Sequence, residues 1–294
     1  MNIFKVSLAF AVRILENMER KHLWLIAAGL TYYFLMSLFP GLAVLAAAVA
    51  YIPVGGMQNV TKFLGYVMPS QAVSMLGQFL SLIRPHRSGL LSFGIIVTLW
   101  LSSVAVKAII AGLDIVHEVR TPRRLWTNRV LALGLTFGVG ILLLLGVALT
   151  LAGPSVEALL AKAVPVQSLW ISVWTHLQWL PAAFFIFAAI ELLYVLAPNL
   201  PVHQRVTIPG ALVAAAFWLV LSWSLGFYFK HFGEVKLARM YGFLATPIAV
   251  MVWLYWSAFA ILLGAEINSS LQFSRSSRAA DSKRTLQPRK LDAA

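Results

Sequence analysis

The sequence contains no cysteine and few charged residues, and these two shortages exclude several kinds of protein and site. Without cysteine there is no disulfide, no thiolate nucleophile and no cysteine-ligated zinc or iron–sulfur centre. Charged residues make up 11% of the chain, with 10 acidic residues against 23 Lys and Arg. Hydrophobic residues make up 60% and the mean hydropathy is +0.83, whereas soluble domains contain about 45–50% apolar residues. The composition therefore predicts an all-α, polytopic membrane protein.

Motifs of common catalytic sites are also missing from the chain. There is no Walker loop, no GxSxG sequence and no pair of histidines with the spacing of metal ligands, and five of the 6 histidines fall outside the apolar stretches. We therefore expect no metal site, no cofactor and no enzymatic activity.

Six apolar stretches are long enough to cross a membrane, since about 20 helical residues span the roughly 30 Å of hydrocarbon. We predict a single six-helix transmembrane domain over residues 23–273. Its spans are expected at about 23–52, 90–113, 130–151, 177–197, 208–229 and 244–267. The first apolar stretch is too long for the core of a cleavable signal, which has about 7–15 residues, so we expect it to remain as an anchor.

Three segments outside the spans have a different character. Residues 1–22 alternate apolar and charged side chains in a pattern typical of an amphipathic helix lying on a membrane surface. Residues 71–83 form a second amphipathic segment that is too short to cross, so it is also predicted to be interfacial. Residues 274–294 are polar and basic, and we predict a disordered cytoplasmic tail.

The distribution of basic residues predicts the orientation in the membrane. With the N-terminus inside, the cytoplasmic segments hold 15 Lys and Arg and the opposite segments hold 7. Because cytoplasmic loops are enriched in basic residues, both termini are expected in the cytoplasm. The net charge of +13 is then explained by orientation, and the expected partner is the bilayer with its anionic headgroups rather than nucleic acid.

Only three ionisable side chains fall well inside predicted spans, namely Lys107, Glu191 and Glu266. Each lies about 10–14 Å from the cytoplasmic end of its predicted helix. Charges at membrane depth are costly and usually face the interior of a bundle. Two interpretations remain open: a buried ion pair that fixes how the helices pack, or a polar site that is reached from the cytoplasm.

Small and polar residues recur at helical spacing in the first and last spans. Gly29, Tyr33, Ser37 and Pro40 share one face of the first span, and Ala260, Gly264 and Asn268 recur every four residues in the last. Such faces are typical of close helix packing. A role for Tyr32, Tyr33 or Ser37 in lining a polar path is the alternative.

Four stretches together resemble the YihY/BrkB family of bacterial inner-membrane proteins. They are AAGLTYYFLMSLFPGL at 27–42, YVLAPNLPV at 194–202, PGALVAAAFW at 209–218 and YGFLATPIAVMVWLYWSAFAILLGAEIN at 241–268. The motif positions include Tyr33, Ser37, Pro40, Pro198, Asn199, Pro209, Gly210, Tyr241, Gly242, Trp253, Tyr255, Gly264, Glu266 and Asn268. Lys107 belongs to none of these motifs.

The resemblance implies a location in the inner membrane and leaves two hypotheses for function. The first is a transporter or flippase of a lipid or small solute, with a polar site at Glu266, Glu191, Lys107, Tyr33, Ser37 and Asn268. The second is a non-catalytic membrane scaffold or envelope-assembly partner. The family has also carried the label of ribonuclease BN. That activity is not expected here, because the acidic residues of the loops are scattered over both sides of the membrane. The oligomeric state stays open.

Overall fold

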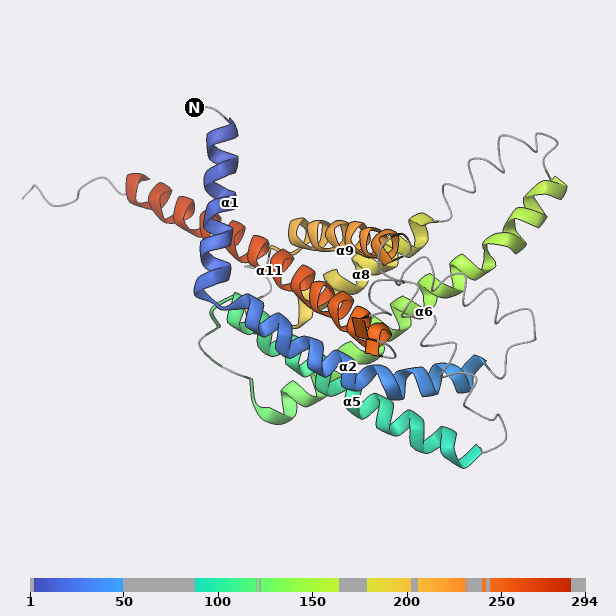
Figure 1. The fold of residues 1–294 in the computed structure, drawn as a ribbon. Helices are drawn as coiled ribbons and strands as arrows, with labels where there is room; N and C mark the ends of the chain where they lie inside the picture. Colours follow the sequence, from blue (N-terminus) through green and yellow to red (C-terminus); the bar gives the residue numbers. More distant parts are fainter. Residues whose placement is uncertain are drawn as a thin grey trace, which may run out of the picture.

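The computed structural model describes residues 3–49, 88–119, 121, 123–163, 179–201, 206–229, 231, 240–241 and 244–286. These residues form seven helices and no strand, so the all-α prediction is confirmed for this part of the chain. The helices, numbered as in Figure 1, are α1 (Ile3–Arg20), α2 (Leu23–Val49), α5 (Ser88–Val116), α6 (Leu125–Ala163), α8 (Trp179–Leu196), α9 (Ile208–Tyr228) and α11 (Ala245–Leu286). The predicted interfacial segment 71–83 lies outside these residues.

Four of the helices are long and apolar enough to cross a membrane, judged by length and composition. Their apolar windows are Leu99–Val116, Leu125–Gly146, Ile208–Tyr228 and Ala245–Ser274. Shorter apolar stretches occur in α2, at Leu23–Leu38, and in α8, at Leu180–Leu196. The structure thus supports four spans by these criteria, and the total of six remains a prediction.

The C-terminal segment differs from its prediction. Helix α11 continues to Leu286, although the polar and basic composition predicts disorder from residue 274. The segment has no glycine or proline before Pro288, and adding a residue to an existing helix costs far less than starting a new one. Polar composition alone therefore did not predict where this helix ends.

A sharp corner separates α1 from α2. His22 has a φ of 51°, a left-handed conformation in which His is found more often than most residues. Its backbone N–H donates to the carbonyl of Glu19 over 2.9 Å, and its own carbonyl accepts from Leu25 over 3.0 Å at the start of α2. As a result, α1 stands across the direction of α2 and α5 and meets the C-terminal half of α11 (Figure 1).

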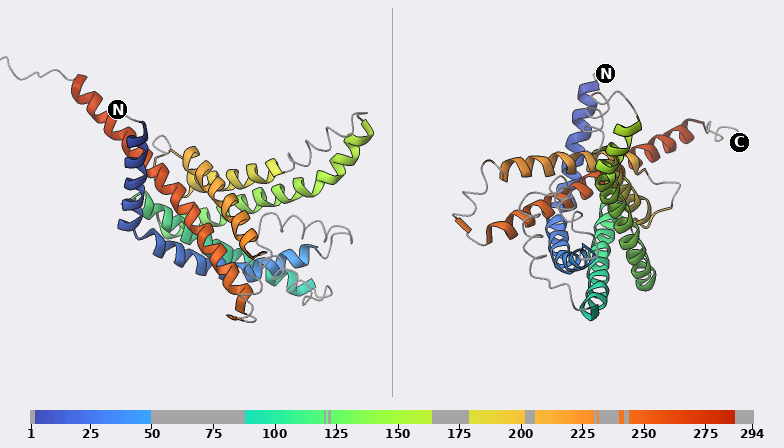
Figure 2. Two further views of the ribbon diagram at one scale, coloured as in Figure 1. Left: turned by 45° about the horizontal axis from the view of Figure 1, so that its top comes forward. Right: turned by 90° about the vertical axis from the view of Figure 1, so that its right-hand side faces the viewer.

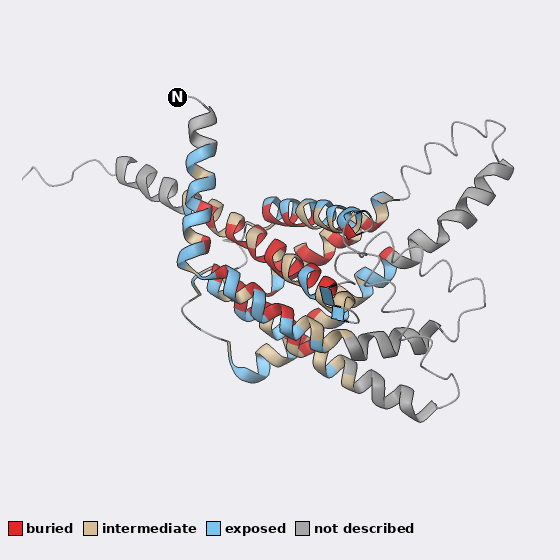
Figure 3. Cartoon of the chain, in the orientation of Figure 1, coloured by how far each residue is buried: buried red, intermediate tan, exposed pale blue. Residues whose placement is uncertain are grey.

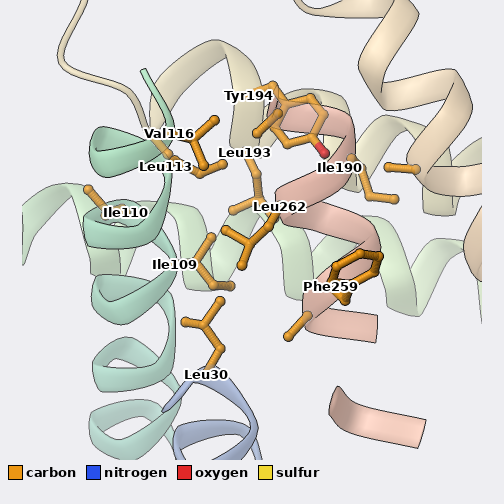
Figure 4. Close-up of a cluster of buried hydrophobic side chains, with 14 of the residues drawn as sticks. Leu30, Ile109, Ile110, Leu113, Val116, Ile190, Leu193, Tyr194, Phe259 and Leu262 are labelled. Atoms are coloured by element: carbon orange, nitrogen blue, oxygen red, sulfur yellow. The ribbon is translucent and has the colours of Figure 1, made fainter. Parts of the chain in front are cut away.

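The core lies where α2, α5, α6, α8, α9 and α11 converge. Its most completely buried apolar side chains include Leu23, Ile110, Leu113, Leu135, Tyr194 and Leu262, several of which are drawn in Figure 4. Figure 3 shows buried residues along the middle of α11 and on the facing sides of α2 and α5. Helix α8 lies along α6, and α9 lies along α11 (Figure 2). Helix α11 is therefore the central element of the bundle.

Close contact between α9 and α11 depends on two glycines. A Cβ at Gly264 would overlap the carbonyl oxygen of Gly210, and a Cβ at Gly210 would overlap that of Gly264. Further along, Trp218 of α9 donates to Ser257 over 2.9 Å, and Trp253 of α11 donates to Ser222 over 3.1 Å. Small residues allow the backbones to touch, and the hydroxyl groups satisfy the indoles.

Candidate functional site

Glu266 lies in α11, and its carboxylate is completely buried. Lys21, directly after α1, donates to Oε2 over 2.7 Å, and Asn17 donates to Oε1 over 2.8 Å from one turn earlier in the chain. Ser270, one turn further along α11, donates to the same Oε1 over 3.1 Å. Both oxygens are therefore bonded and the negative charge faces a cation, which compensates for the loss of water. We call Asn17, Lys21, Glu266 and Ser270 the α1 clamp.

The α1 clamp also holds the end of α5. Lys21 donates to the carbonyl of Val116 over 2.6 Å, and Ser269 donates to the same carbonyl over 3.2 Å. The last carbonyls of a helix have no partner within it, so these bonds satisfy a group that would otherwise be left open. Lys21 is only 8% exposed. One side chain thus connects α1, α5 and α11 and closes the space around Glu266.

His117 follows α5 and borders the α1 clamp. Burial lowers the pKa of His117, and the nearby Lys21 charge acts in the same direction, while the Leu113 carbonyl, Glu266 and Asp114 oppose the shift. Its Nδ1 lies 2.9 Å from the carbonyl of Leu113. Since a carbonyl can only accept, this nitrogen carries the hydrogen. The lowered pKa of His117 favours a neutral imidazole that carries its hydrogen on Nδ1.

A second polar cluster lies between α8, α9 and α11. Thr207, just before α9, donates from its hydroxyl to Oε1 of Glu191 over 2.5 Å. Asn268 donates to the carbonyl of Thr207 over 2.9 Å and accepts from the backbone N–H of Gly210 over 2.7 Å. Asn268 therefore holds the start of α9, where backbone N–H groups lack helical partners. We call Glu191, Thr207 and Asn268 the α9 polar cluster.

The second carboxylate oxygen of Glu191 has a different environment from either oxygen of Glu266. Oε2 is buried and has no hydrogen-bond partner among the residues that the structure describes. A buried polar atom without a partner is uncommon and costs free energy, so it points to a proton, ion, water or ligand that completes the site. The α9 polar cluster therefore has an unused binding capacity that the α1 clamp lacks.

The structure separates the other residues of the predicted polar site from Glu266. Lys107 is exposed on α5, and no described residue forms an ion pair with it. Tyr33 is 39% exposed on α2. Ser37 donates to the carbonyl of Phe34 in its own helix over 2.9 Å. Glu266 and Asn268 lie two positions apart on α11 and bond to different neighbours, so the predicted residues do not form a single cluster.

The motif residues between α8 and α9 have structural contacts. Arg123 donates to the carbonyls of Leu196, Ala197 and Pro198 over 3.2, 2.7 and 3.1 Å and so caps the end of α8. The backbone N–H of Asn199 donates to Asp114 over 2.9 Å, and its side chain donates to the carbonyl of Thr121 over 2.7 Å. These bonds fix the connection that positions the α9 polar cluster.

The remaining motif residues have less informative positions. Pro209 and Tyr241 are exposed. The side chain of Pro40 and all of Gly242 lie outside the described residues. Within the described ranges, no three His, Asp or Glu side chains converge as metal ligands would.

Sequence reasoning missed Lys21, Asn17 and Thr207. Lys21 counted only as a basic residue of a surface helix, because nothing in the sequence identifies α11 as the helix that α1 meets. The spacing of Asn17 and Lys21, one turn apart next to the buried Ile14 and Met18, was the available signal.

Comparisons with known proteins agree with one another. The family model described as virulence factor BrkB matches residues 14–288. The ribonuclease-like protein YfkH of Bacillus subtilis (strain 168) is 31% identical over 246 residues, which cover 83% of this chain and 88% of that protein. A UPF0761 membrane protein of Tolumonas auensis is 29% identical over 255 residues, covering 84% of this chain and 80% of the relative. No solved structure matches.

Proposed function

Because the chain belongs to the BrkB virulence factor family, in which relatives are named membrane proteins, we propose that it is a transporter or flippase of a lipid or small solute. The observation that carries this proposal is the unpartnered Oε2 of Glu191. Ionisable groups at membrane depth are typical of substrate and ion paths. No catalytic role is proposed, and the ribonuclease-like name belongs to the Bacillus relative.

In this proposal the α9 polar cluster is the binding site. Oε1 of Glu191 is held by the Thr207 hydroxyl, and Thr207 is in turn held by Asn268 through its carbonyl. The carboxylate is thereby oriented while Oε2 stays available to a proton, a cation or a polar group of the substrate. In transporters, substrate and ion sites are typically formed where membrane helices are interrupted and their end groups are free to bind.

Glu266 has a supporting role in the same proposal. Its two oxygens are bonded by Lys21, Asn17 and Ser270, which leaves no free acceptor for a substrate. The α1 clamp instead closes one end of the bundle and sets the position of α11. Asn268 lies on the same helix, so the α1 clamp also positions the α9 polar cluster.

The proposed location is the bacterial inner membrane with both termini in the cytoplasm. The excess of Lys and Arg on the predicted cytoplasmic segments supports this orientation. It would place the α1 clamp, the end of α5 and the C-terminal part of α11 on the cytoplasmic side.

The test is translocation of lipids and small solutes by the purified full-length protein in proteoliposomes, with Glu191→Gln as the variant. We expect the protein to move at least one compound above the rate in empty liposomes and the variant to lose most of that activity. Glu16→Gln, which removes a carboxylate from an exposed position on α1, is the matched control and should keep the activity. Full activity in Glu191→Gln would exclude the proposed site.

A non-catalytic membrane scaffold is the second candidate, and the closed environment of Glu266 favours it. A buried ion pair that connects three helices serves to fix their packing and needs no substrate. Absence of translocation over a broad panel of lipids and solutes would favour this role. Partner capture by the intact protein in native membranes would then be the next measurement.

A further inference from the structure

One face of α5 carries a lysine where a membrane would surround it. Lys107 is exposed and lies near the middle of the apolar window Leu99–Val116, about 14 Å from the end of α5. Trp100, seven residues earlier, and Ala111, four residues later, are exposed on the same face. Around Lys107 the described helices therefore leave this face of α5 open.

A second cation from α6 reaches the same face. The guanidinium carbon of Arg129 lies 4.0 Å from the centre of the Trp100 ring, a distance typical of a cation–π contact. The Nη2 atom of Arg129 is buried and donates to none of the described residues. Arg129 also lies inside an apolar window, Leu125–Gly146. The guanidinium is thus oriented by an aromatic ring.

Lys107 and Arg129 lie in apolar windows and have no acidic partner among the described residues, so their charges require another source of compensation. A charged side chain facing hydrocarbon costs several kcal/mol. A lysine side chain can extend along the helix towards the headgroup level, where lipid phosphates lie. The anion available along the membrane face of a helix is the phosphate of a lipid, and Arg and Lys are the usual ligands of phosphate.

We infer that Lys107, Trp100 and Arg129 form a binding site for the phosphate group of an anionic phospholipid on the outer face of α5 and α6. Lys107 supplies an exposed point charge, Arg129 supplies a second positive charge, and Trp100 fixes the guanidinium. The site requires only lipid binding, so it holds independently of the transport proposed above. It also explains why Lys107 has no partner near Glu266.

The experiment measures phospholipid binding to the intact protein in detergent micelles by native mass spectrometry. The probes are dioleoylphosphatidylglycerol, which is anionic, dioleoylphosphatidylcholine, which is zwitterionic, and inorganic phosphate. We expect the phosphatidylglycerol to bind more tightly than the phosphatidylcholine. Lys107→Gln and Arg129→Gln should each weaken phosphatidylglycerol binding about tenfold, the effect of losing one charge-assisted hydrogen bond.

Charge-conserving and distant variants make the result specific. Lys107→Arg and Arg129→Lys should retain most of the binding, and they keep the test valid if a glutamine variant folds poorly. Arg13→Gln removes one charge from an exposed position on α1 and should bind as the unmodified protein does. Equal binding by Lys107→Gln and the unmodified protein, or equal weakening by Arg13→Gln, would overturn the site. If inorganic phosphate alone saturated the site, the site would bind an ion rather than a lipid, and this result would also contradict the proposal.

Discussion

Glu266 and Glu191 are two carboxylates in apolar helices, and the structure gives them opposite surroundings. Glu266 has a cation and two neutral donors on its oxygens. Glu191 has one hydroxyl on Oε1, and its Oε2 has no partner in the described part of the chain. The sequence places both at a similar depth. Their difference arises from which neighbours fold against them, so depth alone does not decide whether a buried acid has a structural or a binding role.

The origin of these neighbours explains the contrast further. Glu266 receives its partners from α1, a helix outside the main bundle that is far away in the sequence. Glu191 receives its partner from Thr207, at the connection that leads into α9. Helix α1 can approach Glu266 closely and exclude water from it. The connection before α9 also has to satisfy the backbone N–H groups at the start of that helix, so it packs less closely around Glu191. The two sites should therefore respond differently to the same kind of substitution.

The largest effect is expected from breaking the α1 clamp. Lys21→Met leaves the Glu266 carboxylate buried without its cation, which should lower the free energy of unfolding by about 3–5 kcal/mol. The measurement is denaturant unfolding of the purified protein in detergent micelles.

Two variants control this prediction. Lys21→Met combined with Glu266→Met should recover most of the loss, because an apolar pair replaces the ion pair. Arg20→Ala breaks an exposed pair with Glu118 and should cost no more than about 1 kcal/mol. A loss in the double variant as large as in the single one would contradict the clamp.

A smaller effect is expected from separating α9 and α11 next to the α9 polar cluster. Gly264→Ala places a methyl group against the carbonyl of Gly210 and should destabilise the protein by about 1–3 kcal/mol. The same unfolding measurement applies. Gly134→Ala is the matched control, since nothing lies within 4 Å of a Cβ at that position. Equal stability of the two variants would show that the close contact is not a constraint.

The smallest effect is a dependence of stability on pH at the border of the α1 clamp. Because the pKa of His117 is lowered in the folded protein, the unfolded chain binds a proton more readily near its ordinary pKa of 6.5. The contribution of His117 should thus be complete above that pH and decrease as the pH falls below it. His117→Gln should flatten this part of the stability profile, and an unchanged profile would exclude His117 as the cause.

The general architecture could be predicted from the sequence because the length of an apolar stretch is a local property. The helices over residues 23–49, 88–116 and 208–228 overlap the predicted spans, since each contains a long apolar stretch. The small-residue face with Gly264 and Asn268 was also visible as a spacing. Its contact with Gly210 was not, because that contact joins residues of different helices.

The candidate site was less accessible to sequence reasoning for a physical reason. Lys107 and Glu266 have similar predicted depths, but the direction of each side chain around its helix decides what it meets. In the structure Lys107 points out of the bundle, and Lys21 bonds to Glu266 instead. Lys21 lies outside the predicted spans, so its depth in a membrane could not identify it. The end of α11 was missed because charge and polarity do not by themselves terminate a helix.

The central claim is that Glu191 is available for binding and Glu266 is not. The most direct test is labelling of the protein in native membranes with dicyclohexylcarbodiimide, an apolar reagent that modifies carboxyl groups able to take up a proton, followed by peptide mass spectrometry. The account predicts modification of Glu191 and protection of Glu266, with Glu266 becoming reactive in Lys21→Met. Modification of Glu266 in the unmodified protein, with Glu191 protected, would contradict it.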